Sequence, residues 1–316
     1  MPDDLTPQMN AFLDKVAEAG IPKLVDLTPQ QARDLMEALS AARLRDFPAP
    51  DVVYAETFST GPGYGHVPVR VYKASDADDL PVIIYYHGGG HVIGSLEIYE
   101  TLCRFLANAA GCAVVSVDYR MGPEHRFPAA AEDSYDALRW VADKAEKLGI
   151  DATRIAVSGD SAGGNLAAVV ALMAREADGP AVSAQALIYP VVDYRGGTAS
   201  YDRYGAGYGI LEAPTIDWFR EHYFANANDM DDWRAAPHLA TSHAGLPPAL
   251  VITAECDVLR DEGVAYAKQL SDAGVAVEHT EYAGVVHGFF GYLGLVDEAE
   301  QAHGRVASYL NGIWSR

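Results

Sequence analysis

Short apolar runs alternate along this chain with longer segments in which apolar residues recur at helical spacing. The strand-like runs lie at residues 82–86, 113–117, 154–157, 185–189, 249–254 and 277–282, and helical segments lie at 129–147, 165–175 and 263–273. This alternation predicts an α/β fold in which helices cover both faces of a mostly parallel sheet. Residues 52–58 and 67–72 flank a Gly/Pro-rich turn, and they predict an antiparallel pair at the start of the sheet.

Two segments depart from this alternation. Residues 6–46 contain two helical stretches separated by Ile-Pro and Thr-Pro steps, and residues 193–233 contain a Gly/Tyr-rich loop and an amphipathic helix. We interpret both segments as parts of a helical cap. The predicted division is a first cap segment at 1–48, a core at 49–192, a second cap segment at 193–235 and the rest of the core at 236–316.

The composition changes this picture by excluding several kinds of partner. The 316 residues are 49% hydrophobic and carry a formal net charge of −21, which would repel nucleic acid and anionic membranes and favours neutral small molecules as ligands. No apolar run is long enough to span a membrane and the N-terminus lacks signal-peptide features, so we expect a cytoplasmic protein without membrane insertion. Three cysteines form neither a disulfide framework nor a zinc pattern, and we expect no cofactor and no metal.

The first candidate for chemistry is Ser161, in the sequence Gly-Asp-Ser-Ala-Gly at residues 159–163. The motif follows a strand-like run and precedes a helical segment, which is the context of a nucleophile elbow. Its two glycines and its alanine leave room for a strained backbone that would expose the hydroxyl. The alternative is an ordinary small-residue turn between a strand and a helix.

A run of three glycines, Gly88, Gly89 and Gly90, follows the strand-like run at 82–86 and His87. Backbone amides without a nearby Cβ can approach a ligand closely, so the amides of Gly88 and Gly89 are candidate donors to an oxyanion. The amide of Ala162 would be the third donor. The alternative is a flexible hairpin, and the glycines make a helix with His87 and His91 on one metal-binding face improbable.

A serine nucleophile requires a base and an acid that orients it. Asp257 comes first in the loop after the strand-like run at 249–254, and His287 lies beside a glycine in the loop after 277–282. We take Asp257 as the acid and His287 as the base. Glu255, Asp261 and Glu262 are rivals, but we interpret Asp261 and Glu262 as first-turn residues of the next helix, where its dipole favours carboxylates.

With these motifs the chain resembles the hormone-sensitive-lipase-like carboxylesterases, the bacterial family IV esterases of the α/β-hydrolase superfamily, in the branch whose serine motif reads Gly-Asp-Ser-Ala-Gly. The motifs that carry the resemblance lie at residues 87–90, 118–120, 123–125, 127–130, 159–163, 189–190, 259–263 and 287–289. Met121-Gly122 departs from the usual leucine-alanine, and Val258 stands where a proline commonly follows the acid. Neither departure removes a catalytic group.

The resemblance implies an α/β-hydrolase fold with a helical cap, and hydrolysis of a small neutral ester with a short to medium acyl chain through a serine acyl-enzyme. Tyr208, Phe219, Tyr223 and Phe289 are the candidate substrate-binding residues, since aromatics suit an acyl or alcohol group. Each of them could instead pack the cap onto the core. Asp160 is expected to brace the elbow through local hydrogen bonds.

Other interpretations stay open. An amidase or a lactonase could use the same three side chains. A non-catalytic receptor on the same scaffold, as in the plant gibberellin receptors, is disfavoured because those proteins have lost the catalytic histidine and this chain keeps His287. Dimers are frequent among similar esterases, so a homodimer through an edge strand such as 277–282 is an expectation.

Overall fold

Eight strands form one sheet in the computed structural model, which describes residues 4–315, in the spatial order β1-β2-β4-β3-β5-β6-β7-β8. The strands are β1 (Tyr54–Ser59), β2 (Pro68–Lys73), β3 (Leu80–Tyr86), β4 (Ala113–Val117), β5 (Ile150–Asp160), β6 (Ala184–Ile188), β7 (Ala249–Cys256) and β8 (Val277–Val286). The pairs β1–β2 and β2–β4 are antiparallel, and the remaining pairs are parallel. The predicted sheet, with its antiparallel pair at the start, is confirmed.

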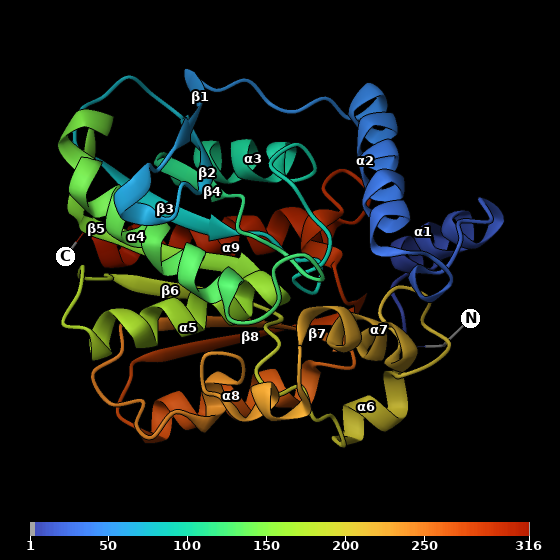
Figure 1. Ribbon diagram of the computed structural model, residues 1–316. Helices are drawn as coiled ribbons and strands as arrows, with labels where there is room; N and C mark the ends of the chain where they lie inside the picture. The colour runs from blue at the N-terminus through green and yellow to red at the C-terminus, as the bar shows by residue number, and fades with distance from the viewer. Residues whose placement is uncertain (1–3, 316) are drawn as a thin grey trace.

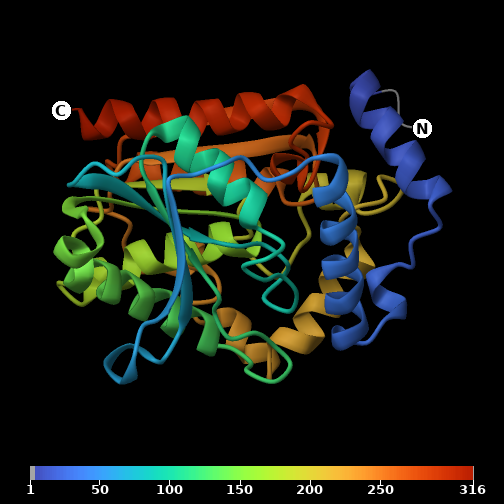
Figure 2. The ribbon, with the colours of Figure 1, turned by 90° about the horizontal axis from the view of Figure 1, so that it is seen from above.

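Helices cover both faces of the sheet (Figures 1 and 2). The helices are α1 (Pro7–Glu18), α2 (Pro29–Asp46), α3 (Glu100–Ala110), α4 (Ala129–Leu148), α5 (Ala162–Glu176), α6 (Ala199–Tyr204), α7 (Ala213–Tyr223), α8 (Arg260–Asp272) and α9 (Asp297–Trp314). Figure 2 shows α3 and α9 on one side of the sheet, with α4 and α5 on the other. Helix α3 was not among the predicted elements, although its buried Leu102, Leu106 and Ala110 recur at helical spacing.

The cap forms where α1, α2, α6 and α7 gather at the carboxyl ends of the parallel strands (Figure 1). Both N-terminal helices begin at a Thr-Pro step, and the Thr28 side chain accepts the amide hydrogen of Gln31 in a capping box. The indole N–H of Trp218 in α7 donates to the carbonyl of Leu27 at 3.2 Å, and Lys23 forms an ion pair with Glu212 at 3.0 Å. The two cap segments therefore pack on each other, while the predicted domain boundaries stay predictions.

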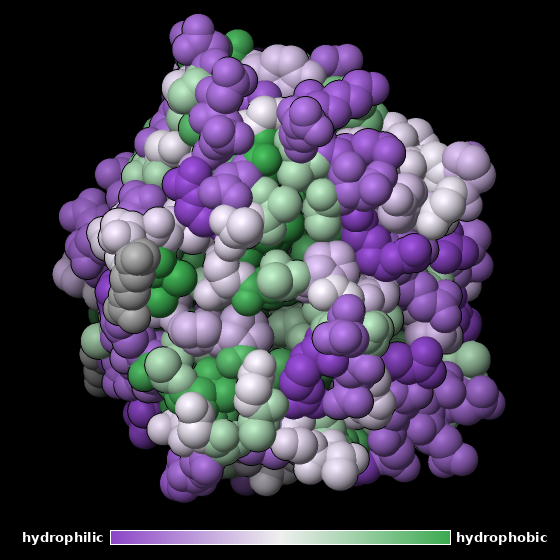
Figure 3. Space-filling view, turned by 90° about the vertical axis from the view of Figure 1, so that its left-hand side faces the viewer, coloured by the Kyte–Doolittle hydropathy of each residue, from purple (hydrophilic) through white to green (hydrophobic). Residues whose placement is uncertain are grey.

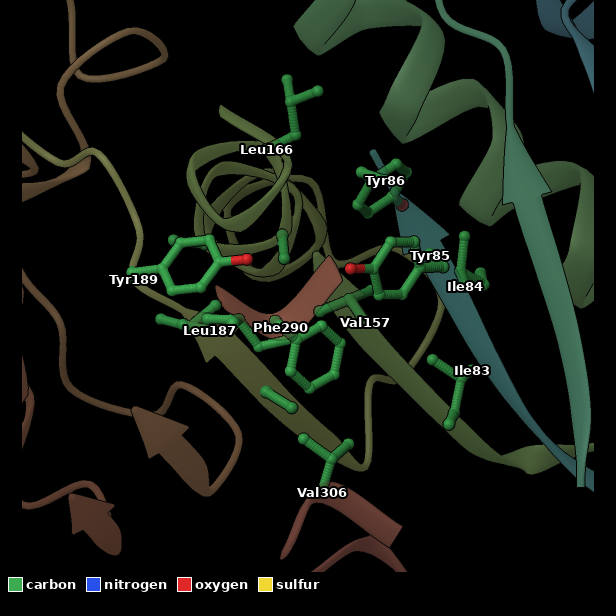
Figure 4. Packing of buried hydrophobic residues seen from close by; sticks show 14 of the residues in the cluster. Ile83, Ile84, Tyr85, Tyr86, Val157, Leu166, Leu187, Tyr189, Phe290 and Val306 are labelled. Atoms are coloured by element: carbon green, nitrogen blue, oxygen red, sulfur yellow. The ribbon is translucent and has the colours of Figure 1, made fainter. Parts of the chain in front are cut away.

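The core lies on both sides of the central strands. Residues 82–86 of β3 are 0% exposed, as expected for a parallel strand with helices on both faces. Figure 4 shows Ile83 and Ile84 near Val157 of β5, with Leu166 of α5 on one side and Val306 of α9 on the other. This packing holds the carboxyl ends of β3 and β5 side by side, and both candidate motifs follow these strands.

Few large hydrophobic side chains are exposed among the residues that the structure describes. Figure 3 views the face opposite the cap, where hydrophobic areas near the centre and the lower left lie among hydrophilic ones. Among residues 4–315 the exposed large hydrophobic residues are Val53, Val264 and Leu295, which belong to different parts of the chain. Within the same residues, no helix combines the length and the apolar content needed to cross a bilayer.

Candidate active site

Ser161 lies at the sharp turn between β5 and α5. Its backbone has φ 55° and ψ −119°, a strained conformation for a residue with a side chain. The turn is fixed by the Ser161 amide, which donates to the carbonyl of Ile188 in β6 at 2.9 Å. A Cβ on Gly159 would lie 2.4 Å from the carbonyl oxygen of Tyr86, so β3 approaches the turn too closely for a side chain there. The predicted nucleophile elbow is therefore present in the backbone.

The structure brings the three predicted catalytic side chains together. His287 Nε2 lies 2.9 Å from the Ser161 hydroxyl, and His287 Nδ1 lies 2.7 Å from Oδ2 of Asp257. Asp257 follows β7 and His287 follows β8, which runs to Val286 and is longer than predicted. Ser161 lies 126 positions and Asp257 lies 30 positions before His287 in the sequence. The three residues meet because parallel strands end at one edge of the sheet.

The environment of the three side chains differs in exposure. Asp257 is 1% exposed and its Oδ1 accepts the amide hydrogen of Leu259 at 2.9 Å, which fixes the carboxylate. The ring of Tyr189 packs 4.7 Å from the imidazole of His287. Ser161 is partly exposed, so its hydroxyl is the accessible end of the series.

The amide of Gly88 is already occupied. Its N–H donates to Oδ1 of Asp160 at 3.1 Å and to the hydroxyl oxygen of Tyr99 at 2.9 Å. A hydrogen shared between two acceptors is not free for a third. The prediction that Gly88 supplies an oxyanion donor is therefore corrected, because its acceptors lie in segments that sequence motifs do not connect with it.

Among the residues that the structure describes, the amides of Gly89, Gly90 and Ala162 beside the elbow have no hydrogen-bond partner. Gly89 has φ 106° and Gly90 has φ 60°, conformations that suit glycine. Ala162 is the first residue of α5, where the helix dipole places partial positive charge. Sequence reasoning missed Gly90, whose only signal is its place as the third glycine of the run.

His87 and His91 do not face a common site. Nδ1 of His87 lies 2.7 Å from the carbonyl oxygen of Gly88, and Nε2 of His91 lies 2.7 Å from the hydroxyl of Tyr194. Burial lowers the pKa of His87 to about 4 and that of His91 to about 3, so both are neutral at pH 7. In the described part of the chain, no group of three or more His, Cys, Asp and Glu side chains is arranged to hold a metal ion.

Arg33 of α2 was not found by sequence reasoning, yet it ties the cap to the segment after the glycines. Its side chain donates to the carbonyls of Val92 at 2.8 Å and Gly122 at 2.6 Å, and it forms an ion pair with Glu124 at 2.7 Å. Glu124 therefore helps to hold the Arg33 side chain in place. Arg120 forms a separate ion pair, with Asp133 of α4 at 2.7 Å.

Two apolar side chains of the second cap segment reach the site. A Cβ on Gly90 would lie 2.2 Å from the ring of Phe219, so this ring covers the third glycine. A Cβ on Gly288, next to His287, would lie 3.9 Å from Cγ2 of Ile210. Phe219 stays a predicted substrate-binding residue, and Ile210, which sequence reasoning did not single out, lies beside the glycine that follows His287.

Tyr223 and Phe289 are corrected to packing roles. Tyr223 is 1% exposed and its ring stacks on His91 at 4.1 Å, while Phe289 is 0% exposed and packs 5.7 Å from Tyr189. Aromatic composition does not separate a lining residue from a core residue. Without exposed surface, neither ring is available to a substrate.

Tyr208 lies against the N-terminal segment. Its hydroxyl donates to the carboxylate of Asp4 at 3.1 Å, and its ring meets Tyr204 edge-on at 5.1 Å. Arg203 forms an ion pair with the same carboxylate at 2.9 Å. These contacts anchor the loop that carries Ile210, and a role of Tyr208 in substrate binding stays a prediction.

Asp261 and Glu262 occupy the first turn of α8 as predicted, but their carboxylates serve other segments. Oε1 of Glu262 accepts the amide hydrogen of Val192 at 2.7 Å, and Oδ2 of Asp261 accepts that of Ser200 at 2.8 Å. Both therefore fix the chain that enters the second cap segment. Neither carboxylate lies in the hydrogen-bonded series that ends at Ser161.

Comparison with known proteins agrees with this geometry. A model of the family described as alpha/beta hydrolase fold matches residues 83–291. The chain is 40% identical to an ethyl acetate hydrolase of Pseudomonas putida over 306 aligned residues. The aligned residues cover 94% of this chain and 95% of the relative. It is 41% identical over 276 residues to the carboxylesterase NlhH of Mycobacterium tuberculosis. This alignment covers 84% of this chain and 86% of the relative.

A solved structure gives the same result in three dimensions. The hyperthermophilic esterase of the archaeon Pyrobaculum calidifontis matches with a TM-score of 0.93 and 42% identity, covering 100% of both chains. These similarities extend over the core and the cap alike. The chain therefore belongs to the α/β-hydrolase family, in the hormone-sensitive-lipase-like group that its motifs resemble.

Proposed function

We propose that this protein is a serine carboxylesterase that hydrolyses short- to medium-chain carboxylic esters through an acyl-enzyme intermediate. The observation that carries the proposal is the continuous series of hydrogen bonds from Asp257 through His287 to Ser161, at 2.7 and 2.9 Å. A histidine held between a buried carboxylate and a partly exposed serine can remove the serine proton and return it to a leaving group.

The reaction proceeds in two halves. His287 Nε2 accepts the proton of Ser161 while the hydroxyl oxygen attacks the ester carbonyl, and the amides of Gly89, Gly90 and Ala162 bind the resulting oxyanion. The proton then passes to the departing alcohol. A water molecule attacks the acyl-enzyme in the second half, with the same histidine as base, and the acid is released.

The relatives support the class of substrate. One relative is named for ethyl acetate, and others are named carboxylesterases or esterases. Phe219 and Ile210 are the apolar groups we place next to the acyl or alcohol part of the ester. A small neutral ester also suits a chain with a net charge of −21.

The test uses p-nitrophenyl esters graded from acetate to decanoate, with wild type and Ser161→Ala. We expect wild type to favour the short to medium esters and Ser161→Ala to lower kcat by about 10⁴-fold or more. The matched control is Ser158→Ala, on the strand that leads to Ser161, whose hydroxyl donates to the carbonyl of Ala186 at 2.9 Å. Its kcat should stay within about twofold of wild type.

A serine-directed phosphonate provides the second measurement. Labelling mapped to Ser161 supports the nucleophile, whereas absence of both label and hydrolysis would favour a non-catalytic receptor. Amide or lactone turnover faster than that of every ester would replace the proposal with an amidase or a lactonase.

Assembly and location complete the proposal. The predicted homodimer would pair through β8, which is the last strand of the sheet. Light scattering should give twice the chain mass, and a monomer across the micromolar range would overturn the dimer. A cytoplasmic location stays a prediction, which fractionation of the native host would test.

A further inference from the structure

Asp160, the residue immediately before the candidate nucleophile, is bound to the glycine run and not to the elbow. Its Oδ1 accepts hydrogen bonds from the Tyr85 hydroxyl at 2.8 Å and from the Gly88 amide at 3.1 Å. Its Oδ2 accepts the Tyr99 hydroxyl at 3.0 Å. The partners lie 75, 72 and 61 positions away, so the expectation of local hydrogen bonds at the elbow is corrected.

The carboxylate of Asp160 is enclosed by donors. It is 7% exposed, and burial raises its pKa, whereas Tyr85, Tyr99 and the Gly88 amide act in the opposite direction by hydrogen bonding to the charged form. The pKa values of Tyr85 and Tyr99 are raised well above 10, because both rings are buried. Both phenols therefore keep their hydrogens and remain donors.

The fit between the carboxylate and the loop leaves no spare volume. A Cβ on Gly88 would lie 2.5 Å from Oδ2 of Asp160 and 2.9 Å from the hydroxyl oxygen of Tyr99. The hydroxyl of Tyr99 accepts from Gly88 while it donates to Asp160, so the three groups form a closed set. The first glycine is thereby held against the side chain that precedes the nucleophile.

The peptide between His87 and Gly88 is fixed at both ends. The His87 carbonyl accepts the Tyr119 hydroxyl at 2.7 Å, and the Gly88 N–H donates to Asp160 and Tyr99. In a trans peptide the carbonyl and the N–H point in opposite directions, so two such contacts fix the plane. The glycine run therefore starts in one orientation.

That orientation is passed to the next two amides. The Gly88 carbonyl faces Nδ1 of His87 at 2.7 Å, and the Gly89 carbonyl accepts the amide hydrogen of Val92 at 3.0 Å. The same planar geometry turns the N–H groups of Gly89 and Gly90 away from these contacts. Neither of these two amides has a hydrogen-bond partner among the described residues.

We propose that Asp160 is a positioning residue of the oxyanion hole: with Tyr99 it holds the Gly88 amide, and so it sets the direction of the Gly89 and Gly90 amides. The inference rests on the proposed esterase function. It assigns Asp160 no contact with substrate and no proton transfer. Its effect is to keep two donors aimed at the oxyanion before the substrate arrives, which is where such donors are most effective.

The test compares Asp160→Asn and Tyr99→Phe with wild type on p-nitrophenyl butyrate, after titration of active sites with a phosphonate. Donors that act only on the oxyanion affect kcat and leave KM nearly constant. We expect Asp160→Asn to lower kcat by about 10- to 100-fold with KM within about threefold, and Tyr99→Phe to have a smaller effect of the same kind. Because both side chains hold one amide, the double variant should lose less than the product of the single effects.

A trifluoromethyl ketone supplies a readout that loss of folded protein does not change. Ser161 adds to its carbonyl carbon and His287 takes the proton, which leaves a hemiketal oxyanion in the same place as that of the ester intermediate. Its Ki should rise by the factor that lowers kcat/KM. Ser158→Ala again serves as the buried control on the same strand, with kcat and Ki unchanged.

The outcomes separate the two proposals. If wild type neither hydrolyses esters nor binds phosphonate, the proposed function fails. If wild type is active but kcat and Ki of Asp160→Asn equal those of wild type, the positioning role fails alone. An increase in KM with constant kcat and constant Ki would also overturn it, because it would indicate a ground-state contact.

Discussion

Gly163, in the first turn of α5, lies against the end of β3 so closely that a Cβ on it would be 1.8 Å from the carbonyl oxygen of Tyr86. The same Cβ would be 2.6 Å from the carbonyl oxygen of His87, where the glycine run begins. One glycine thus brings the nucleophile elbow and the start of the glycine run into contact. No flexible side chain could yield there, because both neighbours are backbone atoms.

Gly163→Ala should therefore destabilise the protein by about 3 kcal/mol or more, since either β3 or α5 must move. Urea unfolding measures this change. Gly312→Ala is the matched control, because that glycine lies within α9 with nothing within 4 Å of a new Cβ. The control should be neutral or stabilising by up to about 1 kcal/mol, as alanine favours a helix. Equal effects of the two changes would contradict the close approach.

Glu262 gives stability a pH dependence of its own. Burial raises its pKa well above 4.5, so above that value the folded protein holds a proton that the unfolded chain releases. Stability from this residue consequently falls as pH rises from roughly 4.5 towards the raised pKa, by up to about 1.4 kcal/mol per pH unit.

Glu262→Gln keeps an acceptor for the Val192 amide but does not titrate. The free energy of unfolding of wild type relative to this variant should decrease between pH 5 and 7. Urea titrations at three pH values measure the difference. A difference that is constant, or that grows with pH, would show that the carboxyl is ionised throughout.

Burial of His303 gives the free energy of unfolding the opposite pH dependence, with a loss of stability in acid. Its ring stacks on Phe290 at 3.7 Å and its Nδ1 bonds to the carbonyl of Ala299 at 2.8 Å, and burial lowers its pKa to about 3. The unfolded chain takes up a proton near roughly pH 6.5, so stability is lost as pH falls from there towards 3. Removing the imidazole should make the protein less sensitive to acid.

His303→Phe tests this loss of stability. Between pH 6 and 4, wild type should lose up to about 1.4 kcal/mol per pH unit relative to the variant. Thermal or urea unfolding at each pH gives the slope. Parallel pH curves for the two proteins would mean that the folded state accepts the proton as readily as the unfolded one.

Phe219→Ala tests the apolar wall beside Gly90. Removing a ring that covers this glycine opens space next to the proposed oxyanion site, so longer acyl chains should gain. We expect the ratio of kcat/KM for p-nitrophenyl octanoate to that for the acetate to rise by about 10-fold, the scale of a few methylene groups. Val53→Ala, at a residue that is 62% exposed, controls for general effects. An unchanged ratio would remove Phe219 from the substrate-binding residues.

The sequence by itself determined the sheet, the elbow and the three candidate catalytic side chains. Strand-length apolar runs and glycines at fixed offsets act within a few residues. Ser161, Asp257 and His287 each follow a parallel strand, so they meet at one edge of the sheet. These features can be recognised without knowledge of the packing, because they specify local backbone conformation and the order of the strands along the chain.

Only the tertiary structure decided which amide is free and which ring is covered. Gly88 and Gly89 look alike in the sequence, but Asp160 and Tyr99 occupy the amide of the first. Tyr223 and Phe219 lie four residues apart in one helical segment, yet one is buried against His91 and the other covers Gly90. The physical reason is that hydrogen-bond partners and burial are set by contacts between segments distant along the chain, which no local pattern encodes.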